Sequence, residues 1–298
     1  MDAREDAEVP TDASTDSELV RQQRIALRGG AVIRGEVFAT YDHRIFWDPE
    51  DRTSIGVFRE DQFAGFPNDR SVTVLDEATI VSREDDGVVR RSFARFRRSE
   101  GIVMRQLPLR GVNYIITAGE SYHLEENGYG HFAWDIVRNR DGARFANRGE
   151  SNEDYFVWDE PVYLPTGGVV VEVESRTPDN TPGTYEDGTP DNLVGVHLGG
   201  SYYLYVLHLR QGSIPSDVIV GARLRQGHLI GHVGNSGISL EPHVHIAMLA
   251  VDADHLPPRS WGVPLELRRG YVARRETGGV RSDYIAPSGG TWISDAPF

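Results

Sequence analysis

Short extended segments separated by glycines fill residues 111–250, and this pattern restricts the fold more than any other feature of the chain. Glycines are dense from Gly221 to Gly237, where they mark tight turns between short strands. No amphipathic helix of ten or more residues appears. β-Branched and aromatic runs predict strands at 167–174, 193–198, 202–209 and 243–249. We therefore predict an all-β fold with mostly antiparallel pairing, because the connections are mostly short.

Two pairs of polar residues lie at even offsets inside extended segments. In Glu241-Pro-His-Val-His-Ile, His243 and His245 share one strand face because alternate side chains point the same way. His131-Phe-Ala-Trp-Asp135 has the same even offset in a run of aromatic and β-branched residues. His208 follows the apolar run that begins at Tyr202. Each pair is therefore able to face one metal ion.

These five residues have the chemistry of a zinc hydrolase site. Catalytic zinc takes three nitrogen or oxygen ligands and leaves a fourth position for water. Two histidines then remain for proton transfer. The chain contains no cysteine, so any metal must bind His, Asp or Glu.

The order of the motifs resembles that of the lysostaphin-type (LytM-like) zinc endopeptidases, the bacterial cell-wall metallopeptidases, over residues 111–250. One departure is Ile246-Ala247, where family members often have Phe and then Glu or Gln; it leaves the metal ligands intact and puts substrate preference in doubt. Four segments match in the family's order: Gly130-His-Phe-Ala-Trp-Asp-Ile, Glu160-Pro-Val-Tyr-Leu-Pro-Thr-Gly-Gly-Val-Val-Val, Tyr205-Val-Leu-His-Leu and Gly231-His-Val-Gly-Asn-Ser-Gly-Ile-Ser-Leu-Glu-Pro-His-Val-His.

The resemblance implies a role for each candidate residue. His131, Asp135 and His245 would bind one zinc ion per chain, while His208 and His243 would assist catalysis. The implied reaction is hydrolysis of peptide bonds in peptidoglycan, at the stem crosslink or a bridge, with a zinc-activated water. We assign His243 as general base and His208 as partner of the developing charge or leaving amine, and their order stays open.

The resemblance also implies an extracytoplasmic location, in the periplasm, the cell envelope or the medium. Residues 1–18 are acidic, contain almost no large apolar side chain and lack the charged and apolar regions of a signal peptide. We therefore expect an export signal or lipid anchor to have been removed. No stretch approaches the 18 apolar residues that a membrane span needs.

Four regions are predicted along the chain. In the second region, we expect 78–82 and 83–89 to form two strands joined by a turn at Asp86-Gly87. The regions are a disordered acidic tail (1–18), a smaller β-rich accessory region (19–109), a LytM-like zinc peptidase domain (110–272) and a C-terminal tail (273–298).

The composition of the chain argues against some of the alternative functions. The net charge of −14 argues against a nucleic-acid partner. One alternative is a non-catalytic LytM-like regulator or wall-binding module. Another is a carrier or sugar-binding β domain, but all 31 basic residues are arginine, which excludes a lysine-attached cofactor.

Several other residues have two interpretations. The Gly- and Pro-rich segment 177–192 is either a loop bordering the active-site groove or a tolerated surface insertion. We interpret His197, His228 and His232 as packed or hydrogen-bonded residues rather than ligands.

Overall fold

The computed structural model describes residues 19–41, 54–59, 72–89, 102–117, 132–252, 259–285, 287 and 289–298. These residues form strands and two short 3-10 helices, Glu77–Thr79 (η2) and Asn152–Asp154 (η3), and no α-helix. Every ladder between the named strands is antiparallel. The all-β, antiparallel prediction is therefore confirmed.

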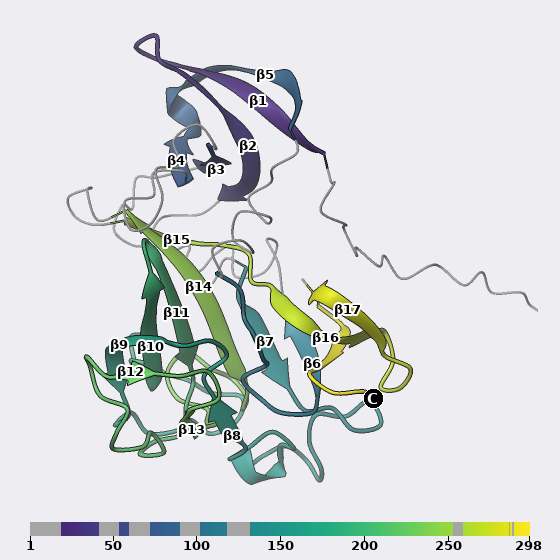
Figure 1. Cartoon of the computed structure of the whole chain (residues 1–298). Coiled ribbons are helices and arrows are strands. Elements are labelled where there is room, and N and C mark those ends of the chain that lie inside the picture. Colours follow the sequence, from purple (N-terminus) through teal and green to yellow (C-terminus); the bar gives the residue numbers. More distant parts are fainter. Residues whose placement is uncertain are drawn as a thin grey trace, which may run out of the picture.

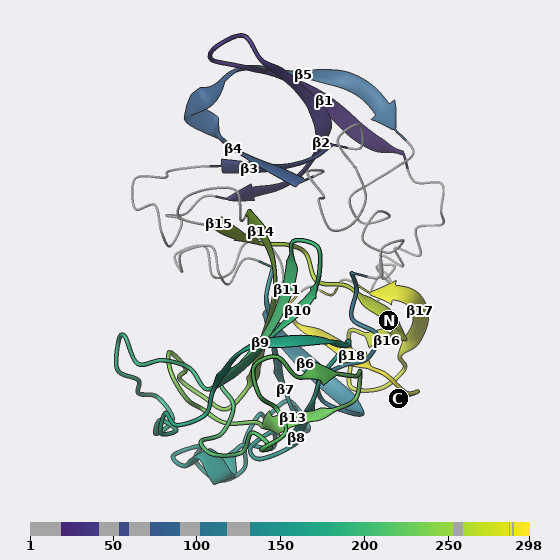
Figure 2. The ribbon, with the colours of Figure 1, turned by 60° about the vertical axis from the view of Figure 1, so that its left-hand side comes forward.

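A smaller sheet comes from the N-terminal part of the chain (Figure 1). Its strand order is β4-β3-β2-β1-β5. Figure 2 shows that the sheet is strongly curled. Its own core contains Ile25, Ile33, Ile55, Val57 and Leu75, all buried. The strands are β1 (Val20–Leu27), β2 (Val32–Tyr41), β3 (Ser54–Phe58), β4 (Val72–Asp76) and β5 (Ile80–Val89).

The predicted turn at Asp86-Gly87 is wrong, because β5 runs through it without a break. Opposite β5, the register moves from Arg21↔Val88 to Gln23↔Asp85, so three steps on β5 face two on β1. The extra residue forms a β-bulge, and Gly87 takes the positive φ of 91° there. An Asp-Gly pair thus bends one long strand instead of joining two.

The larger sheet has eleven strands, in the order β12-β9-β10-β11-β14-β7-β6-β18-β16-β17, with β15 paired to β14. A separate two-stranded sheet pairs β8 (Pro161–Tyr163) with β13 (Leu229–His232). The eleven are β6 (Val112–Thr117), β7 (Trp134–Val137), β9 (Gly168–Glu174), β10 (Leu193–Gly199), β11 (Tyr202–Leu207), β12 (Arg223–Leu224), β14 (Val244–Asp252), β15 (Arg259–Gly262), β16 (Leu267–Ala273), β17 (Val280–Ile285) and β18 (Thr291–Ser294).

Apolar side chains on the central strands anchor this sheet. Leu204 and Val206 of β11 and Ile246 and Met248 of β14 have no exposed surface, and Trp134 of β7 is 2% exposed. Burial of each such side chain is worth about 1.5–3 kcal/mol. The strands that carry the candidate site residues are therefore held firmly side by side.

Residues beyond both predicted boundaries of the peptidase domain belong to the larger sheet or to its core. Ile102, Met104, Leu107 and Leu109 belong to the larger core, although they lie before residue 110. β17 and β18 extend the sheet beyond residue 273, and Trp292 of β18 packs edge-on against Tyr114, with ring centroids 5.1 Å apart. The division at 109 and 273 remains a prediction.

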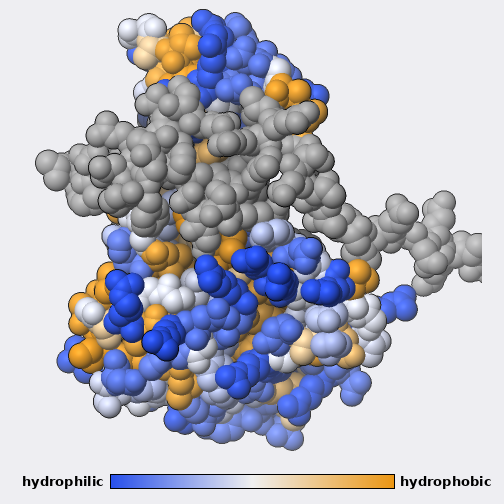
Figure 3. Space-filling view, viewed as in Figure 1, coloured by the Kyte–Doolittle hydropathy of each residue, from blue (hydrophilic) through white to orange (hydrophobic). Residues whose placement is uncertain are grey.

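Hydrophilic residues (blue) cover most of the visible described surface of the larger sheet, with smaller hydrophobic patches between them (Figure 3). Within the described ranges, no helix has the length and apolar character needed to cross a membrane.

Candidate metal and catalytic site

Strand β14 brings the candidate residues together because it lies between β11 and β7. Its register places His245 directly opposite Asp135 on one side and Leu207 on the other. His243 precedes β14 and shares the face of His245, whereas Val244 between them is fully buried on the opposite face. Residues more than 100 positions apart in sequence thus become neighbours.

Asp135 is at the centre of the contacts. Its Oδ1 lies 2.9 Å from Nδ1 of His245 and 3.5 Å from Nε2 of His243. The three side chains are 9%, 7% and 12% exposed, in the order Asp135, His245 and His243. A carboxylate and two imidazoles interact strongly at such distances, because little solvent reaches them to screen their charges.

His208 joins this cluster through an unusual backbone conformation. The predicted strand 202–209 ends at Leu207, because His208 takes φ = +61°. This left-handed conformation breaks the alternation of side chains and is costly for a residue other than glycine. The ring of His208 consequently lies 4.6 Å from that of His243 and 5.6 Å from that of His245, between centroids.

The three histidines offer nitrogens that all lie within 4.8 Å of one another. His208, His243 and His245 therefore form a possible metal-binding group, and Asp135 adds a carboxylate beside it. His131, the remaining residue of the predicted set, lies outside the described residues. Four of the five predicted site residues converge on one place.

Hydrogen bonds to backbone carbonyls set which ring nitrogen carries a proton. Nδ1 of His243 donates to the carbonyl of Glu241 (2.8 Å), and Nδ1 of His208 donates to the carbonyl of Ser236 (2.9 Å). A carbonyl oxygen only accepts, so Nδ1 is protonated in both rings. Nε2 of each neutral ring is left to accept a proton, which is what general acid–base chemistry requires.

The pKa of His243 is raised above its ordinary value. Burial alone lowers it, but the negative charge and hydrogen bond of Asp135, together with the Glu241 carbonyl, act in the opposite direction and win. In the protein without metal, Asp135 therefore favours the charged form of His243.

A buried polar network supports His243 from behind. Ser239 Oγ lies 3.4 Å from Nδ1 of His243 and within hydrogen-bonding distance of Asn235 Oδ1 (2.7 Å) and the Glu241 carbonyl (3.0 Å). Asn235 in turn donates to Asn152 Oδ1 (3.0 Å). Asn235 and Ser239 come from the Gly-Asn-Ser-Gly-Ile-Ser segment quoted above, but the sequence did not reveal their support of His243.

The segment 177–192 borders this site, in line with the first of the two interpretations. Asn180 N donates to the carbonyl of Asn235 (2.9 Å), and Gly183 N donates to that of Leu240 (2.7 Å). At its end, Asp191 Oδ1 lies 2.9 Å from Nδ1 of His208. Burial raises the pKa of Asp191, but the contact with His208, the charges of His208 and His245, and the backbone N–H of Ile238 together lower it below its ordinary value.

Three further histidines in the described part of the chain have ordinary partners, as predicted. His197 Nε2 lies 2.9 Å from the carbonyl of Gly200. His228 Nε2 is 3.2 Å from Asp217, and His232 Nδ1 is 2.8 Å from Asp159 Oδ1.

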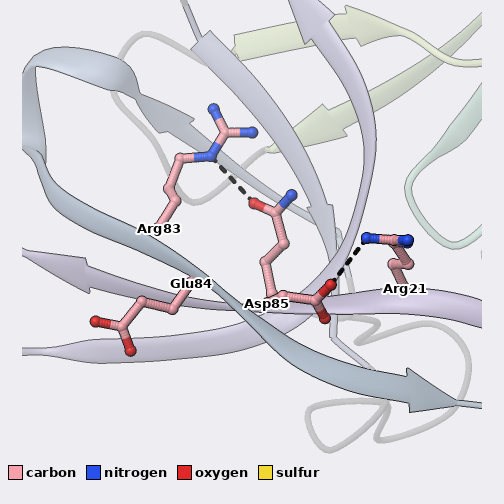
Figure 4. A pocket seen from close by; sticks show the side chains of 5 residues that line it. Arg21, Arg83, Glu84 and Asp85 are labelled. Atoms are coloured by element: carbon pink, nitrogen blue, oxygen red, sulfur yellow. Dashed lines mark hydrogen bonds and ion pairs between the residues drawn. The ribbon is translucent and has the colours of Figure 1, made fainter.

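A hollow lies on the N-terminal sheet, lined by Arg21, Gln23, Arg83, Glu84 and Asp85 (Figure 4). Arg21 contacts Asp85 at 3.0 Å, and Arg83 donates to Gln23 Oε1 at 3.1 Å. The hollow thus consists of exposed groups that satisfy one another, and it offers no cluster comparable to that of the histidines.

Comparison with known proteins gives one family match. Residues 154–257 match peptidase family M23, a stretch that includes His208, His243 and His245 but not Asp135. This match confirms the resemblance to lysostaphin-type peptidases. No curated protein matches the chain.

Several solved structures are similar. A mutant catalytic domain of the prophage-encoded M23 protein EnpA from Enterococcus faecalis is 16% identical, with 51% of this chain and 88% of that chain covered and a TM-score of 0.32. The catalytic domain of the antimicrobial peptidase lysostaphin from Staphylococcus simulans is 20% identical, with 46% and 79% covered and a TM-score of 0.28. The M23 metalloprotease pseudoalterin from the deep sea is 17% identical, with 50% and 70% covered and a TM-score of 0.31.

Proposed function

From the M23 peptidase segment at residues 154–257, we propose that this chain is a zinc-dependent endopeptidase that hydrolyses peptide bonds of peptidoglycan. The convergence of Asp135, His208, His243 and His245 carries the proposal. A structural role alone gives no reason to bury four ionisable side chains against one another, since buried charges are costly unless they are paired or bind a metal.

The donor set suits zinc. Asp135 Oδ1 and His245 Nδ1 are 2.9 Å apart, and two ligands of one tetrahedral zinc ion are about 3.3 Å apart when each bond is about 2.0–2.1 Å long. A shift of a few tenths of an ångström therefore converts this contact into a pair of ligands. In the proposed arrangement, His131, Asp135 and His245 hold one ion, and His208 and His243 remain free.

When bound, zinc polarises the scissile carbonyl and lowers the pKa of water. The chain's own residues supply the proton transfers. We assign His243, whose Nε2 lies beside Asp135, as the base that takes a proton from the attacking water. His208 acts as the acid in its imidazolium form: it keeps the proton on Nδ1, which the Ser236 carbonyl holds, and gives the proton on Nε2 to the leaving amine, which leaves the ring neutral.

The peptidoglycan substrate and an extracytoplasmic location are part of the proposal and rest on the resemblance to cell-wall peptidases. The bond is either the stem-to-stem crosslink or a bridge between stems. Incubation with crosslinked and uncrosslinked muropeptides, followed by mass analysis of the fragments, identifies the bond. A protein that binds these fragments without cutting them is the non-catalytic wall-binding module instead.

Two matched variants test the assignment of roles. Asp135→Ala should lose both zinc and activity, because it removes a ligand. His208→Ala should retain zinc and lose most turnover, because it removes a proton carrier. If His208→Ala instead loses the metal, the three histidines are the ligands and the proposed division of roles is wrong. Full activity of His208→Ala contradicts its catalytic role.

A further inference from the structure

Asp191 places a carboxylate against the outer side of His208. Its Oδ1 lies 2.9 Å from Nδ1 of His208, the same nitrogen that donates to the Ser236 carbonyl. Oδ1 is buried, and no donor among the described residues directs a hydrogen bond to it. A buried carboxylate oxygen without a directed hydrogen bond is rare and demands an explanation.

Asn192 fixes the position of Asp191 from the next residue along the chain. Its Oδ1 accepts from Thr177 N (2.9 Å), and its Nδ2 donates to the carbonyls of Thr177 (2.8 Å) and Leu209 (3.0 Å). Its backbone N donates to Ser236 Oγ (3.0 Å). Asp191 is thereby tied to both flanks of His208, through Leu209 and through Ser236.

Gly237 makes the space that Asp191 occupies. A Cβ atom at position 237 would lie 1.9 Å from Oδ1 of Asp191, well inside contact distance. The carboxylate therefore reaches His208 only because the residue at position 237 has no side chain.

The two oxygens around Nδ1 restrict the protonation of His208. An unprotonated Nδ1 would face the lone pairs of both Asp191 and the Ser236 carbonyl at 2.9 Å, which is repulsive. A proton on Nδ1 removes that repulsion and leaves Nε2 as the nitrogen available for proton transfer. His208 also has a strained backbone, at φ = +61°, and such a conformation persists only where the surrounding contacts fix it.

We propose that Asp191 is a positioning residue that acts through His208, fixing its ring and keeping its proton on Nδ1. The expected effect of Asp191 on turnover rests on the proposed function. Its effect on the ring position and tautomer of His208 does not. The end of the 177–192 segment would therefore orient a catalytic histidine in addition to bordering the site.

The test is Asp191→Ala, with Asp187→Ala as control, because Asp187 is exposed on the same segment. We expect Asp191→Ala to lower kcat about 10–100-fold, the usual effect of removing a group that orients an active-site histidine, with KM changed less than about twofold. Asp191→Asn retains an acceptor oxygen and should recover part of that loss. Asp187→Ala should match the wild type.

A second readout does not depend on activity. Imidazole ¹⁵N NMR of the metal-free protein reports which nitrogen of His208 carries the proton. Asp191→Ala should raise the share of the Nε2–H form. An unchanged tautomer overturns the proposal, and so does a changed tautomer with unchanged kcat in an active enzyme.

Gly237→Ala provides an independent variant that leaves Asp191 in the sequence but displaces it. Its control is Gly188→Ala, since Gly188 has a similar φ (+79° against +72°) and open space around it. Both variants carry the same backbone penalty, so a loss of kcat specific to Gly237→Ala supports the proposal and equal behaviour opposes it. If the wild type cuts no peptide, the proposed function fails, while the NMR tautomer still decides whether Asp191 holds His208.

Discussion

Substitution of Asn192 by alanine should destabilise the larger sheet and disturb the site at once. Asn192 is fully buried, and its side chain makes three hydrogen bonds, two to the backbone of Thr177 and one to the carbonyl of Leu209. The Leu209 carbonyl keeps a second donor, Ser236 Oγ at 2.9 Å. Thr177, which is 7% exposed, therefore loses the partners of both its N–H and its C=O.

The magnitude follows from those two orphaned groups. Each buried donor or acceptor left without a partner costs about 1–3 kcal/mol, so Asn192→Ala should lower the free energy of unfolding by about 2–6 kcal/mol. The activity should fall as well, because Asp191 loses its anchor beside His208.

Urea unfolding followed by tryptophan fluorescence, with chelator present so that metal binding adds nothing, measures the effect. The comparison requires an unchanged m value, which shows that the same surface is exposed on unfolding. Gln226→Ala is the control, because Gln226 is an exposed amide; it should change stability by no more than about 0.5 kcal/mol. A loss below about 1 kcal/mol for Asn192→Ala would refute the reasoning.

Further predictions concern the support and the titration of His243. Ser239→Ala removes the hydroxyl 3.4 Å from His243 Nδ1 and should lower kcat about tenfold at unchanged fold, as measured by kinetics beside circular dichroism; an unaltered kcat would show that the Glu241 carbonyl alone fixes the ring. In the metal-free protein, His243 should titrate by NMR above its ordinary pKa of 6.5, and Asp135→Asn should lower that pKa; a pKa that does not respond to the substitution contradicts the pairing. Because the folded-state pKa is raised, the contribution of this pair to stability is complete below the ordinary pKa and is lost as the pH rises through the folded-state value.

The strands and the paired site residues were predictable because both follow from the pattern of neighbouring residues in the sequence. Alternation fixes the face of each side chain, so His243 and His245 had to emerge together whatever the strand's neighbours were. The strands β9, β10, β11 and β14 lie close to their predicted ranges. Their order in the sheet, which places β14 between β11 and β7, depends on long-range pairing that no local pattern contains.

The features that the sequence did not reveal depend on contacts between distant segments. Asp191 is an unremarkable residue of a loop until folding brings it against His208 and the bare backbone of Gly237. The left-handed conformation of His208 likewise ends a strand inside an apolar run that predicts continuation. At Asp86-Gly87, a dipeptide typical of hairpin turns forms a bulge because the opposing strand β1 continues past it.

The most direct test of the account is metal content measured together with hydrolysis. Purified protein should contain one zinc ion per chain, lose its hydrolysis of crosslinked muropeptides on chelation, and regain it when zinc is restored. Metal-free protein that is correctly folded and cuts muropeptides at the same rate in the presence of chelator would contradict the central claim.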